Sequence, residues 1–167
     1  IYYLARMLYA GEDIKFIARR IMICAAEDVS NADPMALVVA TSAAQAVERL
    51  GMPEARIVLS QAAAYVASAP KSNSAIMAID KAMELVRTEK TPAIPSYLQD
   101  RHYKGAEKLG RGIGYKYAHD YPNHYVDQQY LPDPYVGMKL YNPGELGLEK
   151  ERKAWLDRIR TQEETEE

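Results

Sequence analysis

Residues 105–112, Gly-Ala-Glu-Lys-Leu-Gly-Arg-Gly, come close to the pattern of a phosphate-binding P-loop. Such a loop needs Lys and then Ser or Thr after its second glycine, to reach the terminal phosphates and the magnesium ion. Arg111 and Gly112 stand at those positions, and no apolar strand precedes the segment. We therefore expect a helix that ends in a glycine turn, and no nucleotide site.

Two histidines, His119 and His124, have Asp120 and Asp127 nearby and could be metal ligands. Their spacing of five residues, on a segment that contains Pro122, matches no standard zinc pattern. Hydrogen bonds to the loop backbone are the interpretation we favour. The sequence thus predicts no metal ion or other cofactor in this chain.

No nucleophile and base can be assembled from the sequence. Cys24, the only cysteine, lies in an apolar helical pattern and is expected to be an inert core residue. Glu27 and Asp28 are better explained as surface charges at a helix end than as an acid–base pair. We predict no catalytic residue and no enzymatic activity for this chain by itself.

A cluster of cations is interleaved with tyrosines between residues 101 and 117. Cations that contact phosphates, beside rings that stack on bases, are typical of a surface for single-stranded nucleic acid. A solvated loop whose tyrosines face the core explains the same composition, so both interpretations stay open. The cations, opposed only by Glu107, are Arg101, Lys104, Lys108, Arg111 and Lys116, and the rings are Tyr103, Tyr115 and Tyr117.

Five helices are expected in residues 1–90, which we predict to form a helical bundle. Glycine and proline divide them, and apolar residues recur with the helical period inside them. Asp33-Pro34 reads as a helix start. The first helix lacks a capping residue before Ile1, so we expect the chain to belong to a longer protein. The expected helices span residues 1–10, 14–28, 33–50, 53–69 and about 74–89.

The third and fourth of these helices are apolar on nearly every side. Residues 35–47 and 57–67 carry no charge, and such a helix must be covered on every side. Since five helices cannot easily hide two of this kind, we predict a subunit interface here. A tight alanine-rich core within one subunit is the alternative. The predicted interface residues are Leu37, Val38, Val39, Ala43, Val58, Leu59, Ala62 and Ala63.

Composition changes after Thr91, where proline, glycine and tyrosine become frequent. We predict that residues 91–167 form an irregular strap that packs on the bundle in a single structural unit, with tyrosine rings as anchors. Within it we expect one short helix at 103–109 and a final helix at 146–162. Leu148, Trp155 and Ile159 should share one face of that final helix.

The overall composition sets wider limits. The net charge of −2 over 167 residues gives no global reason to expect a nucleic-acid or membrane partner. No apolar run approaches the roughly 18 residues that span a bilayer. One cysteine allows no intramolecular disulfide. These features indicate a soluble cytoplasmic protein.

Several ordered runs resemble one family. They include Ala44-Gln45-Ala46-Val47-Glu48-Arg49-Leu50-Gly51-Met52-Pro53-Glu54-Ala55-Arg56, and the segments 3–7, 16–20, 26–29, 69–74, 114–122 and 129–132. From Ile1 to about Arg160 the chain is similar to the C-terminal region of the replication-associated recombination protein A family. Its members are AAA+ ATPases of the RarA or MgsA type, related to clamp loaders and to the Werner-helicase-interacting ATPases.

The resemblance implies an all-α fold like the clamp-loader collar, which assembles the protein into a homotetramer. It also implies a bacterial, nucleoid-associated protein that acts on DNA at stalled forks or ends together with single-strand-binding protein. ATP and magnesium would bind a motor domain N-terminal to this chain, so no motor residue transfers to any position here.

Overall fold

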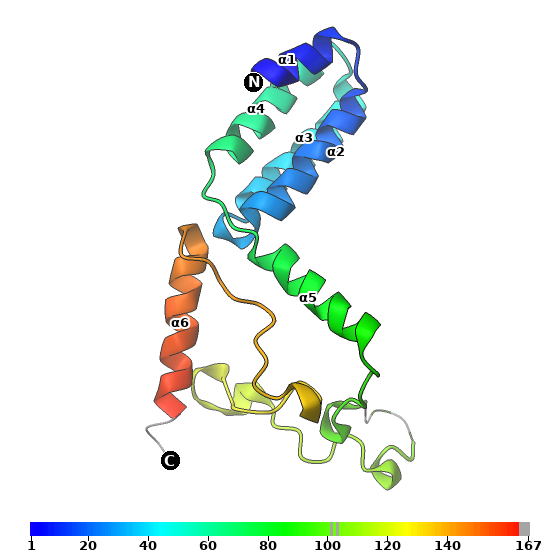
Figure 1. Ribbon diagram of the computed structural model, residues 1–167, viewed down its shortest axis with the longest axis vertical. Coiled ribbons are helices and arrows are strands. Elements are labelled where there is room, and N and C mark those ends of the chain that lie inside the picture. The colour runs from blue at the N-terminus through cyan, green and yellow to red at the C-terminus, as the bar shows by residue number, and fades with distance from the viewer. Residues whose placement is uncertain (101, 103, 164–167) are drawn as a thin grey trace. The chain divides into compact units, whose positions relative to one another are not determined.

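Six α-helices and no strand are present among the residues that the structure, a computed structural model, describes, namely 1–100, 102 and 104–163. The all-α class predicted from the sequence is confirmed. The helices are α1 (Tyr2–Tyr9), α2 (Ile14–Cys24), α3 (Met35–Leu50), α4 (Ala55–Ser68), α5 (Ser74–Thr88) and α6 (Gly147–Glu163) (Figure 1).

Polar caps and a glycine set the helix ends. The Asp13 carboxylate accepts a hydrogen bond from the second backbone N–H of α2 at 3.0 Å. Asp33 accepts one from the first backbone N–H of α3 at 3.1 Å. Gly51, with a φ of +62°, ends α3. Ala25–Val29 continue α2 as a π-helical turn, so the regular helix ends earlier than the sequence predicts.

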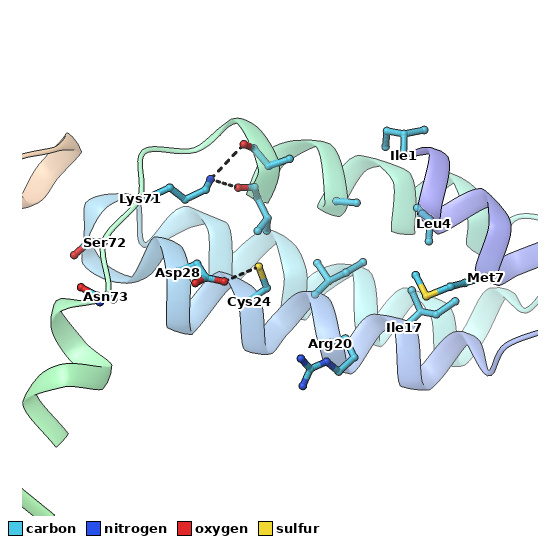
Figure 2. Close-up of a pocket in the computed structure, with 14 residues that line it drawn as sticks. Ile1, Leu4, Met7, Ile17, Arg20, Cys24, Asp28, Lys71, Ser72 and Asn73 are labelled. Atoms are coloured by element: carbon cyan, nitrogen blue, oxygen red, sulfur yellow. Dashed lines mark hydrogen bonds between the residues drawn. The ribbon is translucent and has the colours of Figure 1, made fainter. Parts of the chain in front are cut away.

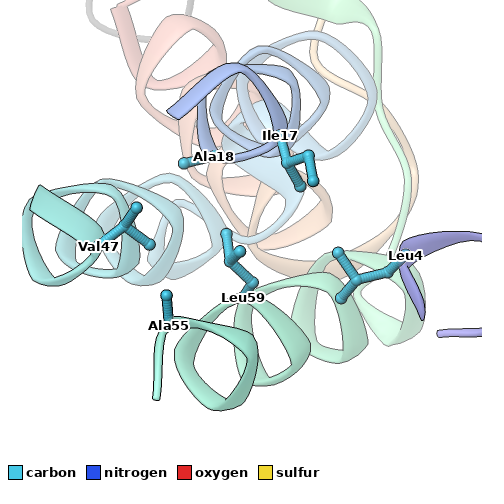
Figure 3. Close-up of a cluster of buried hydrophobic side chains, with 6 residues drawn as sticks. All are labelled: Leu4, Ile17, Ala18, Val47, Ala55 and Leu59. Atoms are coloured by element: carbon cyan, nitrogen blue, oxygen red, sulfur yellow. The ribbon is translucent and has the colours of Figure 1, made fainter. Parts of the chain in front are cut away.

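The helices α2, α3 and α4 pack around two groups of buried side chains. Alanines at these contacts allow the helix axes to approach closely. The first group, which also takes Leu4 from α1, contains Ile17, Ala18, Val47, Ala55 and Leu59 (Figure 3). The second contains Ala25, Val29, Ala36, Ala40, Val66 and Ala69.

Glu149, in the first turn of α6, is fully buried. Its carboxylate accepts hydrogen bonds from the Ser74 hydroxyl, from the Tyr141 hydroxyl at 2.5 Å and from the Gly144 N–H at 2.9 Å. Burial raises the pKa of Glu149, but the hydrogen bonds, including one from Ser72, more than offset this and hold the pKa below its ordinary value. This clasp fastens residues 141–149 to the start of α5.

The chain divides into two compact units. The first contains Ile1–Asp80 and Tyr141–Ala154, and the second contains Lys81–Leu140 and Trp155–Glu167. Both boundaries fall within helices, α5 and α6. The packing of the strap on the bundle therefore stays a prediction.

Short 3₁₀ turns replace regular helices between α5 and α6. The helix expected at 103–109 is reduced to the turn Glu107–Leu109, because Gly105 and Gly110 flank it with positive φ angles; Tyr103 lies outside the described residues. Within the second unit, the Tyr135 hydroxyl donates to Glu89 at 2.9 Å. That tyrosine rings anchor the strap on the bundle stays a prediction.

The final helix is confirmed as α6, but its expected apolar face is not fully buried. Ile159 is buried, whereas Leu148 and Trp155 are 43% and 46% exposed. The carboxylate of Glu149 takes the buried position in the first turn instead.

Candidate subunit interface and nucleic-acid surface

The predicted interface residues fall into three classes of exposure. Leu37 and Val38 on α3 are 42% and 54% exposed. Val39, Val58 and Ala63 are half-buried. Ala43, Leu59 and Ala62 are buried within the chain, and Leu59 belongs to the first core group. The exposed members form an apolar face on the first half of α3, which Met35 extends.

A groove of about 740 Å³ lies between α2 and α4, with α1 at one end (Figure 2). We call it the α2–α4 groove. Its apolar lining includes Ile17, Ile21, Ala63, Val66 and Ala67. Ile1, Leu4 and Met7 lie at the α1 end, and Asp28, Lys71, Ser72 and Asn73 lie at the other (Figure 2). A predicted interface residue, Ala63, is therefore part of its wall.

Hydrogen bonds order the polar end of the groove. The Lys71 ammonium donates to the backbone carbonyls of Val66 and Ala69 at 2.6 and 2.7 Å. It thereby provides hydrogen-bond donors for carbonyl groups at the C-terminal end of α4. The Cys24 thiol donates to the Asp28 carboxylate at 3.1 Å. Burial of the Cys24 thiol raises its pKa, and the hydrogen bond to the Asp28 carboxylate raises it further. The thiol is therefore protonated at neutral pH and is a poor nucleophile.

The cluster of cations and tyrosines lies in the second unit. Lys104, Lys108 and Lys116 are exposed and Arg111 is half-buried; Arg101 lies outside the described residues. Tyr115 and Tyr117 are 47% and 55% exposed, so these two rings face solvent and not a core.

Three rings gather beside this cluster. The ring centroids of Tyr117 and His119 are 5.1 Å apart, and those of His119 and His124 are 4.8 Å apart. Lys116 directly precedes Tyr117 in the sequence, and its backbone N–H donates to the Gln128 side chain at 2.8 Å. Within the part of the chain that the structure describes, no group of three metal-ligating side chains is present.

The P-loop-like segment uses its backbone internally. The N–H groups of Lys108 and Leu109 donate to the carbonyls of Gly105 and Ala106 at 3.1 and 3.0 Å. The Gly112 N–H donates to the carbonyl of Ser96 at 2.9 Å. A phosphate cradle needs such groups to point at the ligand, so this turn is not arranged as one.

Comparison with known proteins decides the family. A family model described as the C terminal of the MgsA AAA+ ATPase matches residues 1–160. The chain belongs to this family. The resemblance seen in the sequence is therefore confirmed over nearly its whole length.

Individual members of the MgsA C-terminal family and its eukaryotic relatives are similar to the chain. Replication-associated recombination protein A of Bacillus subtilis is 49% identical over 147 residues, which is 88% of this chain and 35% of that protein. An uncharacterised AAA domain-containing protein of Mycobacterium tuberculosis is 49% identical over 160 residues, 96% of this chain and 35% of that protein. ATPase WRNIP1 of Dictyostelium discoideum is 36% identical over 141 residues, 84% of this chain and 16% of that protein.

The chain thus spans about a third of the length of its bacterial relatives. Among the described residues, no helix is long and apolar enough to cross a membrane.

Sequence reasoning missed two features of this family member. The Glu149 clasp has no local signal, because two of its donors, Ser72 and Ser74, lie more than seventy positions earlier in the chain. The second feature is the apolar stripe of α5, formed by Ile79, Met83 and Val86. It could have been recognised in the sequence, because the spacing i, i+4 and i+7 marks one helix face.

Proposed function

We propose that this chain is the self-association module of a DNA-dependent AAA+ ATPase, and that it assembles the parent protein into a homotetramer. The parent would act in replication-fork maintenance, recombination and repair; the name of its Bacillus subtilis relative, replication-associated recombination protein A, supports the link to replication and recombination. The observation that carries the assembly role is the exposed apolar surface of a short helical bundle. Leu37, Val38 and Met35 expose 42–54% of their surface on one helix, where solvent contact is unfavourable.

The remaining roles belong to the parent protein. ATP and magnesium would bind its motor domain, and the chain itself would supply no catalytic group. DNA forks or ends and single-strand-binding protein would be partners of the whole molecule, which we place in the bacterial cytoplasm at the nucleoid.

The assembly role can be tested on α3 by measuring particle mass with light scattering after size exclusion. Val38→Glu places a charge on the exposed apolar face, so we expect a smaller particle than wild type at the same concentration. Met52→Glu, at an equally apolar position that is 50% exposed beyond the end of α3, is the matched control and should retain the wild-type mass. Equal masses for all three proteins would place the interface elsewhere.

A second function, a DNA- or protein-docking platform at residues 101–117, is favoured by the exposed rings of Tyr115 and Tyr117 beside Lys116. Binding through four phosphates should give a log–log salt slope of roughly −3 for single-stranded DNA. Charge reversal at Lys104 and Lys116 should weaken binding of fluorescent DNA and flatten this slope. Unchanged binding by the double variant would rule the platform out.

A further inference from the structure

Helix α5 has an apolar face that the chain leaves open. Of its fifteen residues, all of which the structure describes, only Ser74 is buried. Ile79, Met83 and Val86 are 55%, 58% and 62% exposed. They recur at i, i+4 and i+7 and therefore form one continuous stripe. An amphipathic helix of this kind normally buries its stripe against another surface.

The α2–α4 groove is an apolar cleft of matching kind, and within the first unit only α1 contributes to it besides α2 with its π-helical end, α4 and the segment after α4. Helix α1 has eight residues and contributes Leu4 to the first core group only. The wall that α2 provides, Ile17, Ile21 and Cys24, has the same i, i+4 and i+7 spacing as the stripe of α5. Both run for about 10 Å along a helix axis.

Charges at the two edges favour one orientation. Arg20 lines the groove near Ile17, and Asp28 lines it beyond Cys24. On α5, Asp80 follows the first residue of the stripe and Arg87 follows the last. If α5 runs parallel to α2, Asp80 approaches Arg20 and Arg87 approaches Asp28. The opposite direction would bring like charges together.

Neighbouring charges do not reverse this preference. The Lys71 ammonium already donates to carbonyls at the end of α4. Arg87 pairs with Glu84 on its own helix, one turn away, and both side chains are exposed enough to reorient.

We propose that α5 of a second copy of this chain docks its Ile79–Met83–Val86 stripe in the α2–α4 groove, parallel to α2. This is helix-in-groove recognition, and it rests on the proposed self-association. Two copies that exchange α5 reciprocally form a two-fold pair, while copies that pass α5 to a neighbour form a ring that can close with four members. The face of Leu37 and Val38 remains available for a second contact.

The single cysteine makes this docking testable by cross-linking. Cys24 lies in the groove wall, and in the parallel orientation it faces the end of the stripe. We expect Val86→Cys to form a disulfide between two chains under mild oxidation at pH 8.5, seen as a dimer on a non-reducing gel. Met77→Cys is the matched control, because Met77 is 57% exposed on the opposite side of α5; it should give several-fold less dimer.

Light scattering on wild type in the same buffer separates the possible failures. If wild type is a multimer and Val86→Cys gives no more dimer than Met77→Cys, the docking proposal is wrong while self-association stands. A disulfide within one chain, seen as a monomer without free thiol, would show that the chain's own α5 fills the groove. A cross-link from Ile79→Cys in place of Val86→Cys would contradict the orientation. A monomeric wild type would overturn both the docking and the proposed function.

Discussion

The inner, buried faces of the helices and their outer, exposed faces are built from the same kinds of residue but differ in what covers them. On the inner face, Leu59, Ala62 and Ala36 are fully buried between helices of one chain. On the outer face, Val38 and the stripe of α5 are equally apolar yet more than half exposed. The comparison shows that apolar composition tells where a helix must be covered, but not whether its own chain covers it.

The largest expected effect is on the inner face. Leu59→Ala removes a fully buried side chain from the first core group, and we expect the free energy of unfolding to fall by about 2–5 kcal/mol. Val38→Ala, on the outer face, should change it by less than about 0.5 kcal/mol. Urea unfolding followed by circular dichroism measures both. Similar losses in the free energy of unfolding for the two variants would show that Val38 contributes to folding as much as Leu59 does.

A smaller effect is expected at the Glu149 clasp, which is a buried polar contact between residues 141–149 and the start of α5. Glu149→Gln replaces one acceptor oxygen with an NH2 group, which must face either the hydroxyls of Ser74 and Tyr141 or the N–H of Gly144. We therefore expect a loss of about 1–3 kcal/mol in the free energy of unfolding. Glu151→Gln, at an exposed acid in the same helix turn, is the control and should be close to neutral.

The clasp also predicts a dependence on pH. Because the pKa of Glu149 is lowered in the folded chain, its stabilisation is present above the ordinary value of 4.5 and is lost as the pH falls through the folded pKa. The stability difference between wild type and Glu149→Gln should therefore shrink in acid. A difference that is constant from pH 7 to pH 3 would show that the charge of Glu149 contributes nothing.

The sequence predicted the helices far better than their burial. Gly11, Asp13 and Gly51 mark helix ends by local chemistry, and the structure confirms them. Which side of α3 is buried depends on the direction from which α2 approaches, and this is not written in the spacing of a helix that is apolar all round. Leu37 and Ala36 are neighbours in the sequence, but only Ala36 is buried.

The groove was missed for the same reason, and the interface predicted on the third and fourth helices stays a prediction. The charge-free helices pointed to a surface for association, and Ala63 does line the groove. The groove itself depends on how α1, α2 and α4 pack, because the eight residues of α1 reach only one end of the space between α2 and α4. The local sequence pattern does not report such packing. The clasp depends on hydrogen bonds between Glu149 and residues near position 73, and no local pattern reports such a distant pairing.

The variant Val86→Glu should have the smallest effect on folding and the largest effect on assembly. Val86→Glu puts a charge in the exposed stripe of α5 and should leave the unfolding midpoint within a few degrees of wild type, because Val86 is 62% exposed. It should nevertheless lower the particle mass. A variant that unfolds early and keeps its mass would reverse the roles assigned to the two faces.

The self-association of this chain is tested most directly by the solution mass of the wild type, measured by light scattering after size exclusion over a concentration series. We predict a mass several times the 18.8 kDa of one chain, approaching four copies at the highest concentrations. A mass of one chain at every concentration would show that the open apolar faces do not associate, and would contradict the proposal that this module assembles its parent protein.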